Sequence, residues 1–275
     1  MTKSVNVSEA IGHFFKLKDW QMRSLYLGGV MMVAIVVYLV LSFLSLIPIV
    51  GWIIACVGFI ALPVFFVIFL LYLQGYKIDI AQAVVHDREI DEIAPFANYG
   101  RRVAKGFKLA VANFVYQLPV YILYGIGYGL MFVLPFLYPS NSEDSRSFTS
   151  NDLLLMVIML VFFCVFMLAW IVQVLIQYVV YPAQFALFLK EQNIGVVIRP
   201  QNVKEFVKNN FSNLLIYAAI QFAMGMVFAL AVVVASISIF LCIGLILLPI
   251  VLAVGITYML HLEAHMIGQM AKLNK

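Results

Sequence analysis

The sequence predicts an all-α integral membrane protein with six transmembrane helices. Of its 275 residues, 65% are hydrophobic and 11% are charged, and the mean hydropathy is +1.05. Soluble domains carry about 25% charged residues, so this composition excludes a soluble fold. Six apolar stretches each supply the ~20 residues that cross a ~30 Å hydrocarbon core. The connections between them are too short for a second core, so we treat residues 1–275 as a single membrane domain.

The six predicted spans and three accompanying surface helices follow from hydropathy. The spans fall at about 25–47, 52–74, 107–136, 153–184, 212–235 and 238–260. Amphipathic segments beside them predict interfacial or cytoplasmic helices at about 8–23, 77–93 and 200–210. No small-residue cleavage site precedes the first span, which we therefore expect to be an uncleaved anchor.

The distribution of positive charge predicts the orientation. Of 17 Lys and Arg residues, only Arg146, between the third and fourth spans, lies on the side opposite to both termini. Positive residues in short loops remain in the cytoplasm. We therefore predict a multi-pass protein of the cytoplasmic (inner) membrane with cytoplasmic N- and C-termini. The net charge of +4 then faces anionic lipid headgroups and does not indicate a nucleic-acid surface.

An internal repeat links the two ends of the chain. The pattern Cys-x-Gly-x-x-x-Leu-Pro occurs twice, at residues 56–63, which begin with Cys56, and at residues 242–249, which begin with Cys242. Tyr72 and Tyr258 each follow nine residues after the proline of their copy. Both hairpins enter from the same side, which suggests a parallel hairpin repeat. Inverted repeats are more typical of transporters.

Neutral polar residues recur at helical spacing in the third, fourth and fifth spans. They are Asn113, Gln117, Tyr121, Tyr124 and Tyr128; Gln173, Gln177, Tyr181 and Gln184; and Tyr217 and Gln221. Amides that face lipid would leave donors and acceptors unpaired, so we expect these faces to point into the bundle. They form either interhelical hydrogen bonds or a polar cavity for a solute or lipid headgroup. Gly125 and Gly129 form a G-x-x-x-G pair, which permits close helix approach.

The spans carry little that could support chemistry. No ionisable residue lies deep inside a predicted span, which counts against proton- or ion-coupled transport. His261 and His265 have i, i+4 spacing, but Glu263 points elsewhere, and two ligands do not complete a metal site. Nucleophile triads, phosphate-binding glycine loops and paired carboxylates are also missing. We therefore predict no catalytic residue, no cofactor, no metal and no enzymatic activity.

Charged residues gather between the second and third spans. An acidic run of Asp87, Glu89, Asp91 and Glu92 precedes a basic run of Arg101, Arg102 and Lys105. The two runs form either a local, solvated charge network, which contributes little stability, or a docking face for a protein partner. The sequence leaves both interpretations open.

Scattered motifs carry a resemblance to a known family. They are Gly75-Tyr76, Pro95-Phe96, Gly100, Gly106, Leu118-Pro119, Tyr181-Pro182-Ala183 and His265-x-x-Gly268-Gln269. With them the chain, over roughly residues 10–270, resembles the prokaryotic multi-pass membrane family catalogued as domain of unknown function four thousand and thirteen. That family's usual Leu-Pro-Glu-Trp stretch is replaced here by Ala94-Pro95-Phe96. More distantly, the Tyr181-Pro182 turn and the helix after it are similar to the membrane domain of some glycerophosphodiester phosphodiesterases, whose hydrolase motifs are missing.

The resulting functional prediction is a non-enzymatic scaffold or accessory subunit that binds a membrane or cytoplasmic protein partner through its cytoplasmic face. The alternative is a permease or exporter for a lipid-like or small amphipathic solute, which would use the polar faces of the third to fifth spans. In both cases the chain contacts the lipid bilayer and binds no nucleic acid. Assembly into a homo-oligomer stays open.

Overall fold

A computed structural model describes residues 4–47, 50–137, 150–238 and 243–273, and none of these residues forms a strand. Six helices within this described part are long and apolar enough to cross a membrane. They are Trp20–Leu44, Gly51–Val85, Tyr99–Gly129, Leu155–Glu191, Pro200–Ile237 and Ile246–Leu273. Each overlaps one predicted span, so the predicted all-α multi-pass membrane fold is confirmed.

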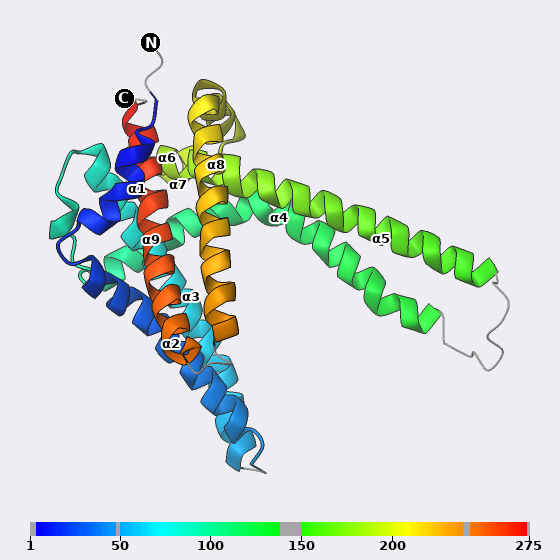
Figure 1. Cartoon of the computed structure of the whole chain (residues 1–275). Helices are drawn as coiled ribbons and strands as arrows, with labels where there is room; N and C mark the ends of the chain where they lie inside the picture. The colour runs from blue at the N-terminus through cyan, green and yellow to red at the C-terminus, as the bar shows by residue number, and fades with distance from the viewer. Residues whose placement is uncertain (1–3, 48–49, 138–149, 239–242, 274–275) are drawn as a thin grey trace.

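The helices form a bundle from which one hairpin diverges. The elements are α1 (Val7–Lys16), α2 (Trp20–Leu44), α3 (Val50–Val85), the 3₁₀ helix η1 (Ile90–Glu92), α4 (Tyr99–Leu137), α5 (Ser150–Leu175), the π-helix η2 (Ile176–Val180), α6 (Tyr181–Glu191), α7 (Ile194–Ile198), α8 (Pro200–Ile237) and α9 (Gly244–Leu273). The α4–α5 hairpin extends away from α2, α3, α8 and α9 (Figure 1). Both chain termini lie at one end, which carries residues 4–20 and 261–273 and which we call the terminal end.

The first predicted surface helix, 8–23, is wrong in its length. The side chain of Asn6 caps α1 by accepting a hydrogen bond from a first-turn N–H. The helix ends at Lys16, because Leu17 has extended backbone angles (φ −64°, ψ 134°). A new helix, α2, then begins at Trp20. This break separates the amphipathic α1 from the first span.

The other two surface helices are continuous with spans. The helix predicted at 77–93 is the end of α3 and stops at Val85. Asp87 then adopts a left-handed conformation (φ 53°), which ends a helix. The helix predicted at 200–210 is the first part of α8, and the non-helical angles of Asn210 (φ −123°, ψ 17°) mark its end as a kink.

The helices α3 and α4 approach each other closely through two glycines. A Cβ added to Gly75 or to Gly106 would meet a backbone carbonyl oxygen of the opposite helix. Only glycine lets two backbones come this near to each other. By contrast, an added Cβ at Gly125 or Gly129 would meet no described atom within 4 Å. The close approach that this second pair permits is therefore not used with any described helix.

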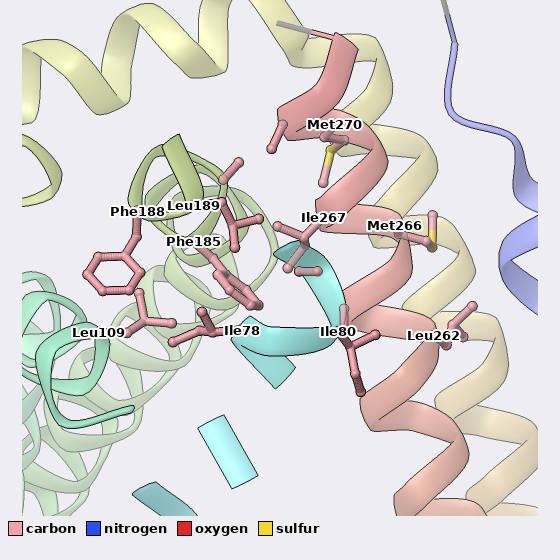
Figure 2. Packing of buried hydrophobic residues seen from close by; sticks show 14 of the residues in the cluster. Ile78, Ile80, Leu109, Phe185, Phe188, Leu189, Leu262, Met266, Ile267 and Met270 are labelled. Atoms are coloured by element: carbon pink, nitrogen blue, oxygen red, sulfur yellow. The ribbon is translucent and has the colours of Figure 1, made fainter. Parts of the chain in front are cut away.

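Hydrophobic burial is concentrated at the terminal end. Figure 2 shows side chains of α3, α4, α6 and α9 meeting there, among them Ile78, Phe185 and Ile267. Each of these three side chains is 0% exposed. Many side chains of the spans are instead more than half exposed and face lipid, such as Phe43 (72%) and Ile246 (71%). The terminal end is thus the tightly packed part of the protein.

Two predictions lie wholly or partly outside the described residues. Arg146 and most of its loop, and Cys242 of the repeat, are outside them. The two prolines of the repeat, Pro63 and Pro249, lie inside α3 and α9. The repeat itself stays a prediction.

Candidate functional site

Residues 86–98, which we call the acidic segment, connect α3 to α4 at the terminal end. The carboxylates predicted to form a docking face, those of Asp87, Glu89, Asp91 and Glu92, are all exposed, as is Arg101 at the start of α4. Arg102 is different, because it is only 2% exposed. Lys105 is half-buried. The predicted docking face is therefore divided between an exposed and a buried layer.

Arg102 anchors the last part of the acidic segment to α3. Its Nε donates to Oδ2 of Asp79 (2.8 Å), and its Nη1 donates to the hydroxyl of Tyr72 (2.8 Å) and to the carbonyl oxygen of Pro95 (2.7 Å). Lys105 donates to Oδ1 of the same Asp79 (2.7 Å). These two cations pair with a carboxylate on α3, so the interpretation as a network between the acidic and basic runs is wrong for them.

Arg23 holds the middle of the acidic segment in the same way. It is 0% exposed and donates to three main-chain carbonyl oxygens of the segment, those of Ile90 (3.3 Å), Asp91 (3.1 Å) and Ile93 (3.0 Å). Its other bonds are to Tyr76 (2.9 Å) and Asp19 (2.6 Å). All five N–H donors of the guanidinium are engaged. Sequence analysis missed this role, although an arginine one turn inside a lipid-facing helix already indicates a buried partner.

A cleft of about 310 Å³ lies between the acidic segment and α4. Five of the predicted docking residues line it, namely Glu89, Glu92, Arg101, Arg102 and Lys105. The acidic segment also contributes Arg88, and α3 contributes Asp79, so charges of both signs surround the opening. The structure brings these residues together around one opening, even though only part of their charge remains exposed.

A second cleft, of about 440 Å³, lies on the other side of the acidic segment between α1, α3 and α9. Asp87 lines it and forms an ion pair with Lys272 of α9. The N–H of Asn6 donates to Oε1 of Gln269 (2.7 Å), which ties the start of α1 to the end of α9. Arg88 lines both clefts, so the start of the acidic segment separates them.

The two histidines of α9 have separate surroundings. Nε2 of His261 lies 3.3 Å from the hydroxyl of Tyr76. The ring of His265 packs against His13 of α1, with centroids 4.6 Å apart, and its Nε2 lies 3.9 Å from a carboxylate oxygen of Glu9. Burial lowers the pKa of His13, which keeps that imidazole neutral at pH 7. Among the described residues, no three His, Cys, Asp or Glu side chains are placed to hold a metal ion.

A buried ion pair joins α3 to α9. Nζ of Lys77 donates to Oε1 of Glu263 (2.9 Å), and the two side chains are 7% and 18% exposed. The ammonium also lies over the rings of Tyr181 (4.9 Å) and Phe185 (5.5 Å). Both charged residues lie just beyond the predicted spans, in helices that continue from them. For that reason, a search for charges deep inside the spans did not find this pair.

The candidate cavity residues do not share one inward-facing surface. Gln117, Tyr181, Gln184, Tyr217 and Gln221 are buried, Asn113, Tyr124 and Gln173 are half-buried, and Tyr121, Tyr128 and Gln177 are exposed. The expectation that all of them point into the bundle is wrong for the last three. None of the set lines either cleft.

Some of the interhelical hydrogen bonds expected of these polar residues are present. Nε2 of Gln184 donates to the carbonyl oxygen of Ala112 (3.3 Å), which joins α6 to α4. The hydroxyl of Tyr181 donates to Oε1 of Gln74 on α3 (2.9 Å). Three other buried amide atoms have no hydrogen-bond partner within the described part of the chain, namely Asn113 Oδ1, Gln184 Oε1 and Gln221 Nε2.

Comparison with known proteins gives one match. A family model described as a protein of unknown function (DUF4013) matches residues 58–243. The matched region includes the acidic segment, Arg102 and Lys77, but not Arg23 or Glu263. No curated protein and no solved structure matches the chain. The distant similarity to phosphodiesterase membrane domains stays a prediction.

Proposed function

This chain belongs to the DUF4013 family of proteins of unknown function, and we propose that it is a non-enzymatic scaffold or accessory subunit of the cytoplasmic membrane. Its terminal end faces the cytoplasm and binds a protein partner through the acidic segment and the cleft beside it. The exposed lysines of this end, such as Lys190, Lys204 and Lys208, support this orientation, since positive residues in short loops remain inside.

The observation that carries the proposal is the anchoring of the acidic segment by two buried arginines. Arg23 and Arg102 together bind four of its main-chain carbonyl oxygens. Hydrogen bonds from a guanidinium are charge-assisted and strong, so the backbone of the segment is held in one conformation. The exposed carboxylates of Glu89 and Glu92 are therefore presented in defined positions. A preorganised surface loses less entropy on binding than a flexible one.

The chemistry of the cleft indicates the kind of partner. Glu89 and Glu92 line it with carboxylates, and the charge of Arg102, which also lines it, is already paired with Asp79. The carboxylates of Glu89 and Glu92 form no ion pair with any described residue. A protein that inserts Lys or Arg side chains at these carboxylates would match their charge, and such complementarity determines specificity.

Site-specific photo-crosslinking in intact cells tests this function. With the photoreactive residue at Ala94, an exposed position that lines the cleft, we expect one discrete crosslinked protein. The charge reversal E89K/E92K should reduce its yield on the order of tenfold. The matched reversal E191K/E205K alters two exposed acids away from the cleft and should leave the yield unchanged. Equal yields in both double variants, or no discrete product at Ala94, would contradict the proposal.

The unpaired amide atoms of Asn113, Gln184 and Gln221 favour a second candidate function, transport of a lipid-like or small amphipathic solute. Buried amides normally have a partner, and a bound solute would supply one. In that case native mass spectrometry of the purified protein should show a retained small molecule that Gln184→Leu removes, with the Ala94 crosslink unchanged. Identical spectra of wild type and variant would rule this candidate out.

A further inference from the structure

An apolar groove of about 490 Å³ lies between α8 and α9, next to α1. Val227 and Ala231 of α8 and Val251 and Val254 of α9 form much of its walls, and Ile11 and Phe15 of α1 close one end. The groove is separate from both polar clefts and shares no lining residue with them. The surface of the groove has almost no hydrogen-bond donors or acceptors for a polar solute, so its natural occupant is a hydrocarbon chain.

The position of the groove brings it into contact with lipid. Both α8 and α9 are membrane-spanning helices, so the medium that reaches the groove is the acyl region of the bilayer. At the α1 end of the groove, the ring of Phe15 stacks on that of Tyr258, and the ring centroids of Phe15 and Trp20 lie 5.4 Å apart. Aromatic residues of this kind gather at membrane–water interfaces. The groove therefore begins at headgroup level and continues into the hydrocarbon core.

Two lysines come shortly after the α1 residues that line the groove. Lys16 directly follows Phe15, and Lys18 lies two residues further on, just beyond the end of α1. Both are exposed and form no ion pair with any residue that the structure describes. One of the two acids nearby is already paired. Asp19 pairs with Arg23 at 2.6 Å, whereas the side chain of Glu9 is 55% exposed and lies 3.9 Å from His265. The two lysines are therefore free to bind a phosphate group at the interface.

From this arrangement we propose that the groove is a binding site for one anionic phospholipid of the leaflet that contacts α1. An acyl chain fills the space between α8 and α9, and the phosphate binds Lys16 and Lys18. The lipid would join α1 to the bundle, since Ile11 and Phe15 contact its chain. The opposite side of α1, with Glu9 and His13, lines the larger polar cleft. Lipid binding therefore holds in place one wall of that cleft.

Lipid retention tests this site directly. The full-length protein is reconstituted in nanodiscs of equimolar phosphatidylglycerol and phosphatidylcholine, extracted with mild detergent and analysed by native mass spectrometry. For wild type we expect retained phosphatidylglycerol to exceed phosphatidylcholine on the order of tenfold, because each lysine near the headgroups contributes about 1 kcal/mol. The variant A231W fills the groove and should lose the retained lipid. The matched variant A229W places the same ring on an exposed position of α8 outside the groove and should retain it.

A charge variant separates the headgroup from the chain and does not alter the packed core. With K16E/K18E, the excess of phosphatidylglycerol over phosphatidylcholine should disappear, and this result does not depend on the folding of A231W. Equal retention by A231W and A229W would show that the lipid binds elsewhere and would overturn the proposal. Equal retention of the two lipids by wild type would overturn it as well.

Discussion

Replacing Gly106 by alanine should destabilise the bundle by about 2 kcal/mol or more. The added Cβ would meet the carbonyl oxygen of Leu71 and would lie 3.0 Å from the backbone nitrogen of Gly75. These are backbone atoms of α3, so they cannot rotate away as the end of a side chain can. Relief would require α3 and α4 to separate, which would disturb the bonds between Arg102 and α3. We expect the apparent Tm in detergent to fall by at least about 5 °C.

Gly129→Ala is the matched control for that change. Gly129 lies in the same helix, α4, and an added Cβ there meets no described atom within 4 Å. Alanine also favours the helix over glycine by about 1 kcal/mol, so its apparent Tm should equal or slightly exceed that of wild type. A drop in Gly129→Ala as large as in Gly106→Ala would mean that the close α3–α4 contact does not account for the effect.

Breaking the buried Lys77–Glu263 pair should have the second large effect. Lys77→Met leaves a carboxylate that is 18% exposed without its partner, and Glu263→Gln leaves a buried ammonium without its counter-ion. Removing one member of a buried pair typically costs about 3–5 kcal/mol. Each single variant should therefore lower the apparent Tm or the yield of folded protein strongly.

The double variant K77M/E263M shows whether the two charges act together. Replacing both members of a buried ion pair by apolar residues of similar volume is often neutral. We therefore expect the double variant to recover most of the stability lost in either single variant, and a double-mutant cycle measures that coupling. If the losses of the single variants simply added, the two residues would contribute independently and the ion pair would not explain their burial.

The spans were predicted well and the ends of the surface helices were predicted poorly, because the two depend on different features of the sequence. All six spans were found, because hydropathy over ~20 residues is a property of one segment. The ends of the surface helices were not, because single residues determine them. Leu17 breaks 8–23, Asp87 ends 77–93 early, and Asn210 only kinks the helix that continues from 200–210. Such breaks leave the average composition of a segment unchanged.

The candidate site was predicted only in part. Clustering of charge along the chain predicted a docking face, which stays a prediction, and the structure places Glu89, Glu92 and Arg101 of that face around one cleft. The clustering could not show that Arg102 is buried on Asp79, or that Arg23, from another helix, binds the acidic segment. The polar faces of the third to fifth spans were expected to point inward, but Tyr121 and Tyr128 are exposed. Helical spacing identifies a face but not the direction in which it points.

The sequence by itself determined that this chain has six helices long and apolar enough to cross a membrane and roughly where each lies, because transfer of a helix into lipid depends mainly on its own composition. Only the tertiary structure decided which polar groups meet. Lys77 and Glu263 are 186 positions apart, and Gly106 rather than Gly129 lies at the close contact between α3 and α4. Such contacts depend on which helices are neighbours and on how each is rotated about its axis. Both are set by packing of the whole chain, and no single segment specifies them.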